Sequence, residues 1–472
     1  MRTHIDKKRR AGGRAAASAG VLLATVCAAA LPAGAQTLQE AWGRAYHTNP
    51  TLEAQRAQLR ATDEQVNQAL SGWRPTVQAG LSSGFANQRS NLGGTLGGGS
   101  TSLNPTTLSL SLQQPLYTGG RTTALTRRAE HNVETQRARL IATEQQIFLD
   151  IGTVYMNALR DQAVVDLNRN NERVIARQLQ ATRDRFSVGE VTRTDVAQAE
   201  ARQAGAIADR FQAEGNLQVS RAIYERLVGE PPGVLVPPNL PTGLPPSRDD
   251  AVAAASADNP TVFAASFAAL GASDNVRAIE GERYPNVNLQ GALSRDYDRT
   301  TQDSRTDLAT VVAEVTIPLY QAGAVSSRIR EAKEFEGQAL TQIEESRRAA
   351  IQDASESWEN IATARARIQS LQSQIQAAEI ALEGVQQEAL VGTRTVLDVL
   401  DAEQELLNAR VNLVVSQRDF AVATLTLASA VGMLTAERLG LNVAFYNPNY
   451  HYEHVRNKVW GTDNTPVVKT SR

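Results

Sequence analysis

The chain has 472 residues, of which 42% are hydrophobic and 21% charged, and its 48 basic and 50 acidic residues leave a net charge of −2. This balance argues against a nucleic acid as partner, because nucleic-acid-binding chains carry a basic surface. The single cysteine excludes a scaffold of disulfide bonds within the chain.

Residues 1–35 have the pattern of a secretory signal peptide. Basic residues from Arg2 to Arg14 precede an apolar run that reaches Leu31, and Ala33-Gly34-Ala35 forms an A-x-A cleavage site. A membrane anchor is the alternative, but the apolar run is short for a bilayer span. Cleavage would remove six basic residues and one acidic residue, which leaves 42 basic and 49 acidic residues and a net charge of −7. It would also remove Cys27, so neither a disulfide nor an attached lipid is expected.

A long stretch without proline organises the chain. None of its 17 prolines lies between Leu116 and Glu230, and proline inside a helix removes a hydrogen bond and clashes with the preceding turn. The stretch predicts a very long helical hairpin at about 120–228 that turns at Gly189, since glycine readily ends a helix. A narrow, mostly apolar stripe predicts coiled-coil packing. Its members are Leu125, Ala129, Val133, Gln136, Leu140, Ile147, Ile151, Val154 and Ala158.

The same design occurs twice. Residues 319–447 also lack proline and predict a second hairpin at about 322–431. Val188-Gly189, Thr192, Asp195 and Gly229 recur 203 residues later, whereas Asn49-Pro50 recurs 210 residues later. One insertion of seven residues explains the difference, so the chain is a tandem duplication with repeats at 36–247 and 248–432.

Four segments change to the two-residue alternation that is typical of strands, at about 76–86, 107–114, 286–294 and 310–317. A glycine-rich, flexible loop is expected between the first two, from residue 91 to residue 100. Each has about ten residues, which is enough to cross a bilayer at a tilt. A soluble sandwich is the alternative, but the polar positions hold Gln, Asn, Ser and Gly rather than Lys and Glu. Four strands cannot close a barrel, and open edges are not tolerated in lipid. Three copies would supply twelve strands.

Two shorter helices complete the predicted plan. Residues 121–186 would form a rod of about 100 Å, of which the return helix covers about half. Helices at 38–71 and 248–282 would supply the missing halves. The linker at 231–246, which contains seven prolines, and the tail at 433–472 would then form a belt midway along the rods.

With these features, the chain resembles the TolC family of outer-membrane channels. The motifs that carry the resemblance are Asn49-Pro50, Gln114-Pro115-Leu116-Tyr117-Thr118-Gly119-Gly120, Pro318-Leu319-Tyr320-Gln321-Ala322-Gly323, Phe186-Ser187-Val188-Gly189 with Thr194-Asp195-Val196, and Val391-Gly392-Thr393-Arg394-Thr395-Val396-Leu397-Asp398-Val399-Leu400-Asp401-Ala402. The resemblance covers essentially the whole mature chain. The tail from Ala444 to Arg456 resembles the members that serve type I protein secretion.

The resemblance implies a mainly α-helical homotrimer, in which a twelve-stranded β-barrel in the outer membrane continues into an α-helical barrel in the periplasm. It implies docking to a periplasmic adaptor protein and to an inner-membrane pump, driven by ATP (an ABC pump) or by protons, that provides the energy. Protein and small-molecule cargo are not distinguished. A structural coiled-coil tether of the envelope is the alternative function. An enzyme is disfavoured, because no Ser-His-Asp order, nucleotide loop or paired-cysteine motif is present, and no cofactor is expected.

Carboxylates mark the second predicted tip. Asp398 and Asp401 lie three residues apart at a helix start, so both can face one side. The resemblance assigns them to a carboxylate ring at the periplasmic entrance, where threefold symmetry would gather six acids that attract cations. Capping is the alternative role, because Thr395 and Asp398, like Thr192 and Asp195, fit a capping box.

The resemblance also implies that links between neighbouring hairpins hold the tip closed. The matching positions are Thr194, Asp195 and Arg394. Related proteins have a tyrosine five residues before the arginine, where this chain has Ala389, so the closed state should be weaker.

Other candidates are weaker still. His451 and His454 have a spacing compatible with a metal pair, but packing in the belt is the favoured interpretation and no metal site is predicted. Trp73 and Tyr284, each just before a strand, could lie at a membrane interface or be ordinary packing residues.

Overall fold

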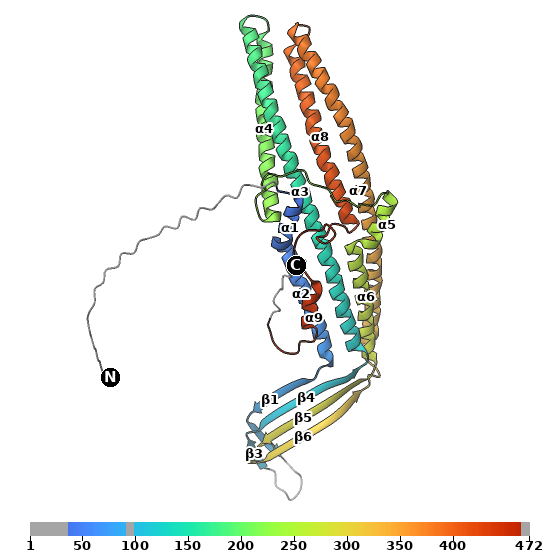
Figure 1. Cartoon of the computed structure of the whole chain (residues 1–472). Coiled ribbons are helices and arrows are strands. Elements are labelled where there is room, and N and C mark those ends of the chain that lie inside the picture. The colour runs from blue at the N-terminus through green and yellow to red at the C-terminus, as the bar shows by residue number, and fades with distance from the viewer. Residues whose placement is uncertain (1–35, 91–98, 464–472) are drawn as a thin grey trace, which may run out of the picture.

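The computed structural model describes residues 36–90 and 99–463. The predicted signal peptide and residues 91–98 of the glycine-rich segment lie outside the described residues. Two long helical hairpins reach one end of the molecule and the strands gather at the other (Figure 1).

The two halves repeat one order of elements. The first half contains α1 (Leu38–Thr48), α2 (Pro50–Leu70), the 3-10 turn η1 (Ser71–Trp73), β1 (Thr76–Ser83), β2 (Ala86–Ser90), β3 (Gly99–Leu103), β4 (Thr106–Thr118), α3 (Arg121–Ser187) and α4 (Arg193–Val228). The second half contains α5 (Arg248–Asp258), α6 (Pro260–Glu280), the 3-10 turn η2 (Gly281–Arg283), β5 (Asn286–Tyr297), β6 (Arg305–Thr316), α7 (Ala324–Leu390) and α8 (Val396–Ala430). A short helix, α9 (Pro448–Val455), lies in the tail and packs on α2.

The longest helices, α3 and α7, have 67 residues each, or about 100 Å at 1.5 Å per residue. The half of α3 nearer the tip packs on α4, and the half nearer the strands packs on α2 and α6 (Figure 1). Of the nine stripe residues predicted on α3, eight are buried and Leu125 is half-buried. Shorter helices thus accompany each half of this long helix, one near the tip and two near the strands.

The structure differs from the single helices expected at 38–71 and 248–282. Each is interrupted by an Asn-Pro pair and forms two helices. Asn49 accepts hydrogen bonds from the backbone N–H groups of Thr51 (2.9 Å) and Leu52 (3.4 Å), and Pro50 takes the first helical position. Asn259 caps α6 in the same way. Proline has no N–H to continue the preceding helix, so a new helix starts there.

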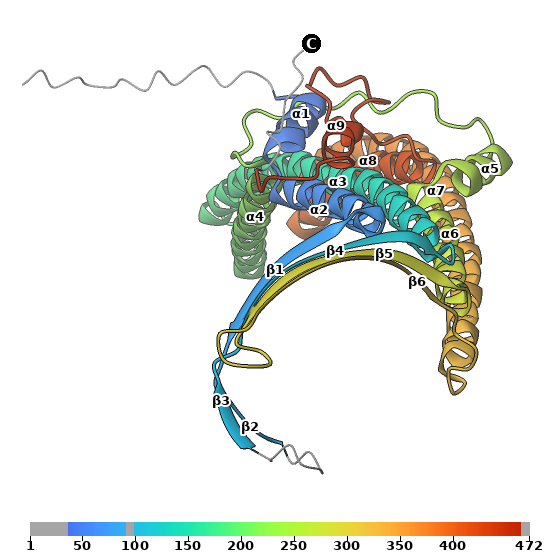
Figure 2. The same ribbon diagram turned by 90° about the horizontal axis from the view of Figure 1, so that it is seen from below.

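The main sheet is antiparallel and has the order β1–β4–β5–β6, so β4 and β5 join the two halves. It curves strongly when viewed along the helices (Figure 2). Directly paired residues share a face, which places the alternating apolar positions together. This apolar face contains Val77, Ala79, Leu81, Leu108, Leu110, Leu112, Leu289, Leu293, Ala309, Val311, Ala313 and Val315. The opposite face is mostly polar, with Gln, Asn, Ser and Thr, although it includes Leu308 and Val312.

A second ribbon extends the first strand pair. The structure pairs β2 with β3, where the sequence predicted a loop from residue 91 to residue 100. Residues 99–100 belong to a strand rather than to the expected loop. Sequence periodicity detects only the alternating apolar segments, whereas the ladder of backbone hydrogen bonds continues beyond them.

The main core lies midway along the helices, where the belt segments cross them. The Trp42 indole N–H donates to the Phe148 carbonyl (2.8 Å), and the two rings stack at 5.8 Å. Tyr46 belongs to the same buried cluster, and Leu425 of α8 contributes to it from the second half of the chain. This core fastens the N-terminal helix, α3 and α8 to one another.

Within residues 36–90 and 99–463, no helix combines the length and the apolar character needed to cross a membrane.

Candidate functional site at the helical tips

Both hairpins turn with the same backbone geometry. Gly189 and Gly392 each have φ of 82°, a left-handed conformation that glycine adopts without steric cost. Beyond the turn, the Glu190 N–H donates to the Arg185 carbonyl (3.0 Å) and the Thr393 N–H donates to the Glu388 carbonyl (3.0 Å). These bonds satisfy carbonyls at the end of each long helix.

Asp398 caps α8, as the capping-box pattern predicted. Its Oδ2 accepts from the Thr395 backbone N–H (2.9 Å) and from the Thr395 hydroxyl (2.8 Å). The backbone hydrogen bond, followed by the hydroxyl, holds the pKa of Asp398 below its usual range. This carboxyl therefore stays charged at neutral pH while it is fixed in position.

Asp401 lies three residues further along α8 and is exposed. Its carboxylate forms an ion pair with Arg202 of α4, which belongs to the other hairpin. The sequence pattern did not reveal Arg202, because only the packing of α4 beside α8 brings the two groups together. The two predicted entrance carboxylates thus differ: Asp398 caps its own helix, whereas Asp401 pairs with a cation of the other hairpin.

The predicted gate residues make local interactions in this protomer. Arg394 Nε donates to Glu388 Oε2 (2.8 Å) within its own hairpin. Asp195 Oδ2 accepts from the Thr192 backbone N–H (2.8 Å) and hydroxyl (2.8 Å), so Asp195 caps α4. Thr194 is exposed on the first turn of α4. Glu388 was not predicted as a partner, since a separation of six residues across a turn has no helical spacing rule.

An apolar cluster joins the two tips of one chain. Val396 and Leu400 of α8 pack with Ile175 and Leu179 of α3 and with Ala199 of α4. Leu400 is only 1% exposed. The tip carboxylates therefore lie beside a buried apolar contact between the two hairpins. A movement of one hairpin relative to the other must disturb this cluster.

A third tip carboxylate, Glu403, was missed by the sequence reasoning. Burial raises the pKa of Glu403, while the charge of Arg410 and a hydrogen bond from Gln386 Nε2 (3.2 Å) oppose the rise. The sequence does contain a signal for it, because Ala402-Glu403 of the second hairpin repeats Ala199-Glu200 of the first.

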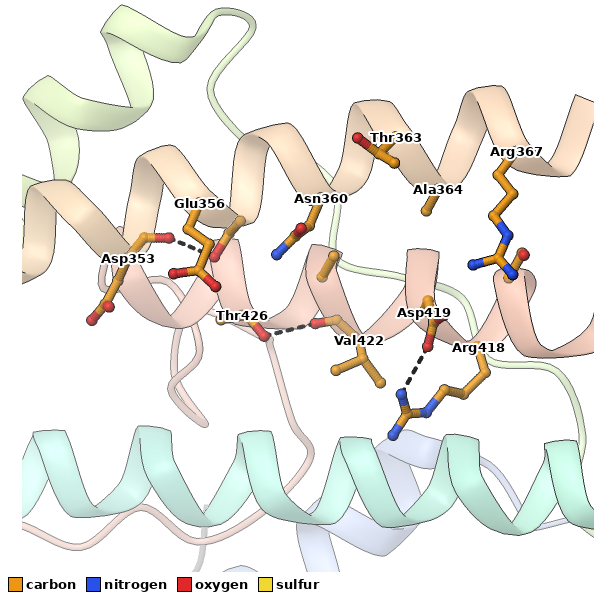
Figure 3. A pocket seen from close by; sticks show the side chains of 13 residues that line it. Asp353, Glu356, Asn360, Thr363, Ala364, Arg367, Arg418, Asp419, Val422 and Thr426 are labelled. Atoms are coloured by element: carbon orange, nitrogen blue, oxygen red, sulfur yellow. Dashed lines mark hydrogen bonds and ion pairs between the residues drawn. The ribbon is translucent and has the colours of Figure 1, made fainter.

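A polar groove lies between α7 and α8, nearer to the belt (Figure 3). It has a volume of about 520 Å³ and is lined by acids and bases of both helices. Burial and the neighbouring Glu356 raise the pKa of Asp353. Arg418 points away from α7, donates to Asn157 of α3 (2.7 Å) and pairs with Asp419 (2.8 Å). Charged side chains of both signs line the groove, so its surface is polar. The part of the chain that the structure describes contains no group of three residues able to hold a metal ion.

The two tail histidines separate in the structure. His451 Nδ1 lies 3.0 Å from Oδ2 of the fully buried Asp63 of α2, whereas His454 is exposed. Burial raises the pKa of Asp63, and the hydrogen bond and charge of His451 partly offset this rise. His451 therefore fixes the tail to α2. Trp73 is half-buried and Tyr284 is 55% exposed, both at the junction of helices and strands.

Comparison with known proteins identifies relatives along almost the whole chain. The profile of the family described as outer membrane efflux protein matches residues 42–230 and 251–433. The outer membrane efflux protein BepC of Brucella suis biovar 1 (strain 1330) is 34% identical over 445 residues, which cover 94% of this chain and 96% of BepC. The outer membrane protein TolC of Escherichia coli (strain K12) is 27% identical over 440 residues, which cover 88% of this chain and 86% of TolC.

A solved structure shows the same fold. The Campylobacter jejuni CmeC outer membrane channel superposes with a TM-score of 0.74 at 15% sequence identity, over 84% of this chain and 85% of that chain. The predicted fold class, two tandem repeats that each combine a β-hairpin with a long helical hairpin, is confirmed by this likeness. On the family match and the similarity to BepC, the chain belongs to the outer membrane efflux protein family.

Proposed function

We propose that the chain is the outer-membrane exit duct of a tripartite export system and that it works as a homotrimer. The sheet carries this proposal, because it has one apolar face, one polar face and two edge strands, β1 and β6, whose outer sides pair with no described strand. Unpaired edges are unstable in lipid. Pairing β1 of one copy with β6 of the next would close a barrel of twelve strands with its polar face inside.

The helices would continue this duct into the periplasm. At about 100 Å, α3 and α7 are far longer than a bilayer is thick. The tips would dock to a periplasmic adaptor protein and, through it, to an inner-membrane pump of the ABC or proton-driven kind. The pump would supply the energy and select protein or small-molecule cargo, so transport through this chain is passive and involves no catalysis, cofactor or nucleic acid. Outer-membrane lipid would surround the apolar face.

Asp398 and Asp401 would form the carboxylate ring at the periplasmic entrance. Threefold symmetry would place six carboxylates around the mouth and favour cations there. Because Arg202 pairs with Asp401, Asp398 would contribute more of the negative field. Replacing both acids with asparagine should therefore reduce the preference for cations, and most of the loss should come from Asp398.

Thr194, Asp195 and Arg394 would form the links that hold the tip closed. In the closed trimer, Arg394 would leave Glu388 and bind Asp195 of an adjacent hairpin. Such an exposed pair contributes about 1 kcal/mol or less, but three around a ring can shift an equilibrium between two states. Ala389 cannot replace the hydrogen bond of a tyrosine, so the closed state should be weak.

Conductance of the purified trimer in planar lipid bilayers tests the proposal. Arg394→Ser combined with Asp195→Ala should raise conductance, whereas Arg193→Ser, which removes an exposed tip charge outside the proposed links, should not. Unchanged conductance of the double variant would reject the links. A trimer without any conductance would instead favour a structural tether.

A further inference from the structure

A charged cluster lies on the apolar face of the sheet, at the end away from the helices. In the register of β5 and β6, Arg295 pairs with Asp307 and Tyr297 pairs with Arg305. Two residues before Arg295, Leu293 belongs to the apolar face, so Arg295, Tyr297, Arg305 and Asp307 share that face.

One carboxylate neutralises only part of this cluster. Asp307 accepts from Arg295 Nε (2.5 Å) and from Arg305 Nη2 (2.7 Å). The side chains of Arg295, Arg305 and Asp307 are 44%, 52% and 51% exposed. Each guanidinium has five N–H donors in a planar fork suited to phosphate. Two cations against one anion leave one positive charge and N–H donors that Asp307 does not use.

An apolar hollow begins beside Arg295 and Asp307. It has a volume of about 470 Å³, and its lining includes Ala79, Leu108, Leu110, Leu293 and Ala309, with Arg295 and Asp307 at its edge. The alanines on β1 and β6 leave space that the leucines between them do not fill. The hollow is continuous with the charged cluster, so one molecule with an apolar chain and an anionic head could occupy both.

The position along the strands matches a membrane surface. Eight residues separate Val315, at the helical end of β6, from Asp307, which corresponds to about 27 Å along the strand. A strand tilt of 35–45° reduces this to a height of about 19–22 Å, and Arg305 and Tyr297 lie at about 24–28 Å. The apolar band of such proteins is about 25 Å tall, and tyrosine favours the headgroup level.

We propose that Arg295 and Arg305 bind the phosphate of an anionic lipid in the outer leaflet and that an acyl chain of this lipid lies in the adjoining hollow. This inference rests on the proposed placement of the sheet in the outer membrane. Arg299 offers a natural contrast, because it is 65% exposed nearby but pairs with Asp296 (3.1 Å), whose position in the register lies on the polar face.

Native mass spectrometry of the trimer in neutral detergent tests the site. The probes are phosphatidylglycerol, phosphatidylcholine with the same acyl chains, and inorganic phosphate. The wild type should bind phosphatidylglycerol about tenfold more tightly than phosphatidylcholine, and Arg295→Gln with Arg305→Gln should abolish this difference. Arg299→Gln should bind like the wild type. Asp307→Asn, which removes the neutralising charge, should bind phosphatidylglycerol more tightly.

Three results would overturn the inference: undiminished preference in the double arginine variant, no gain in Asp307→Asn, or inorganic phosphate that binds as tightly as phosphatidylglycerol. The last result would mean that the hollow contributes nothing and that free phosphate is the ligand. Bilayer conductance of the same variants should remain at the wild-type level. A wild type that shows no lipid preference but conducts normally would refute the lipid site alone, whereas a wild type that does not conduct would refute the proposed duct itself.

Discussion

Two neighbouring tyrosines near the belt should respond oppositely to the same substitution. Tyr155 of α3 and Tyr224 of α4 are both fully buried, with ring centroids 6.4 Å apart. The Tyr155 hydroxyl is directed at the carbonyls of Gln36 (2.7 Å) and Val236 (2.6 Å) and accepts from the Val236 N–H (3.2 Å). The Tyr224 hydroxyl makes no hydrogen bond of normal geometry to a described residue and interacts only weakly with the Gln36 side chain.

Tyr155→Phe should therefore destabilise the protein, whereas Tyr224→Phe should not. The first change removes one hydrogen bond, worth about 1 kcal/mol, and leaves backbone groups of Gln36 and Val236 without a partner, which adds about 1–2 kcal/mol. The second removes a hydroxyl whose burial is already unfavourable, so its effect should be close to zero or stabilising.

Far-UV circular dichroism of the detergent-solubilised trimer, melted at one scan rate, measures the difference. Unfolding entropy scales with chain length, so about 1 kcal/mol corresponds to about 1 °C for a mature chain of this size. We expect Tyr155→Phe to lower Tm by about 2–3 °C and Tyr224→Phe to leave it unchanged or slightly higher. Equal shifts for the two variants would refute the reasoning, because both lose the same atom from a fully buried ring.

Two further predictions concern the belt and the helices around it. Gly152→Ala should cost about 1–3 kcal/mol through overpacking, because an added Cβ would overlap Leu425 Cδ1. Gly215→Ala, at an open helical position, should be neutral or stabilising, and thermal melting of both variants checks the contrast. Burial raises the pKa of Glu144, and the hydrogen bond from the Ala436 N–H (2.7 Å) lowers it only in part. Since the folded pKa exceeds 4.5, this group's contribution to stability is fully present below pH 4.5 and is lost as the pH rises through the folded pKa. Glu144→Gln keeps the acceptor without the charge, so its Tm relative to the wild type should increase across that pH window, and a difference independent of pH would contradict this account.

Several structural features arose from tertiary packing that no local pattern contains. Asp398 was predictable as a cap, since the capping box lies within four consecutive residues. Its neighbour Asp401 pairs with Arg202, which is 199 residues away in sequence. Glu388 holds Arg394 across a turn whose shape depends on Gly392. Interactions within one helical turn follow from the spacing of residues along the sequence. Interactions between hairpins can be found only when the positions of both hairpins in space are known.

The sequence by itself determined the duplication, the two long helices and the alternating strands, because proline avoidance and apolar periodicity are local properties of the backbone. Tertiary structure alone decided that β4 pairs with β5 to join the repeats and that Arg295, Arg305 and Asp307 meet on the apolar face. Strand register sets these neighbours. The register of β4 and β5 depends on pairing between segments about 180 residues apart, and that of β5 and β6 on the turn between them; a period of two specifies neither.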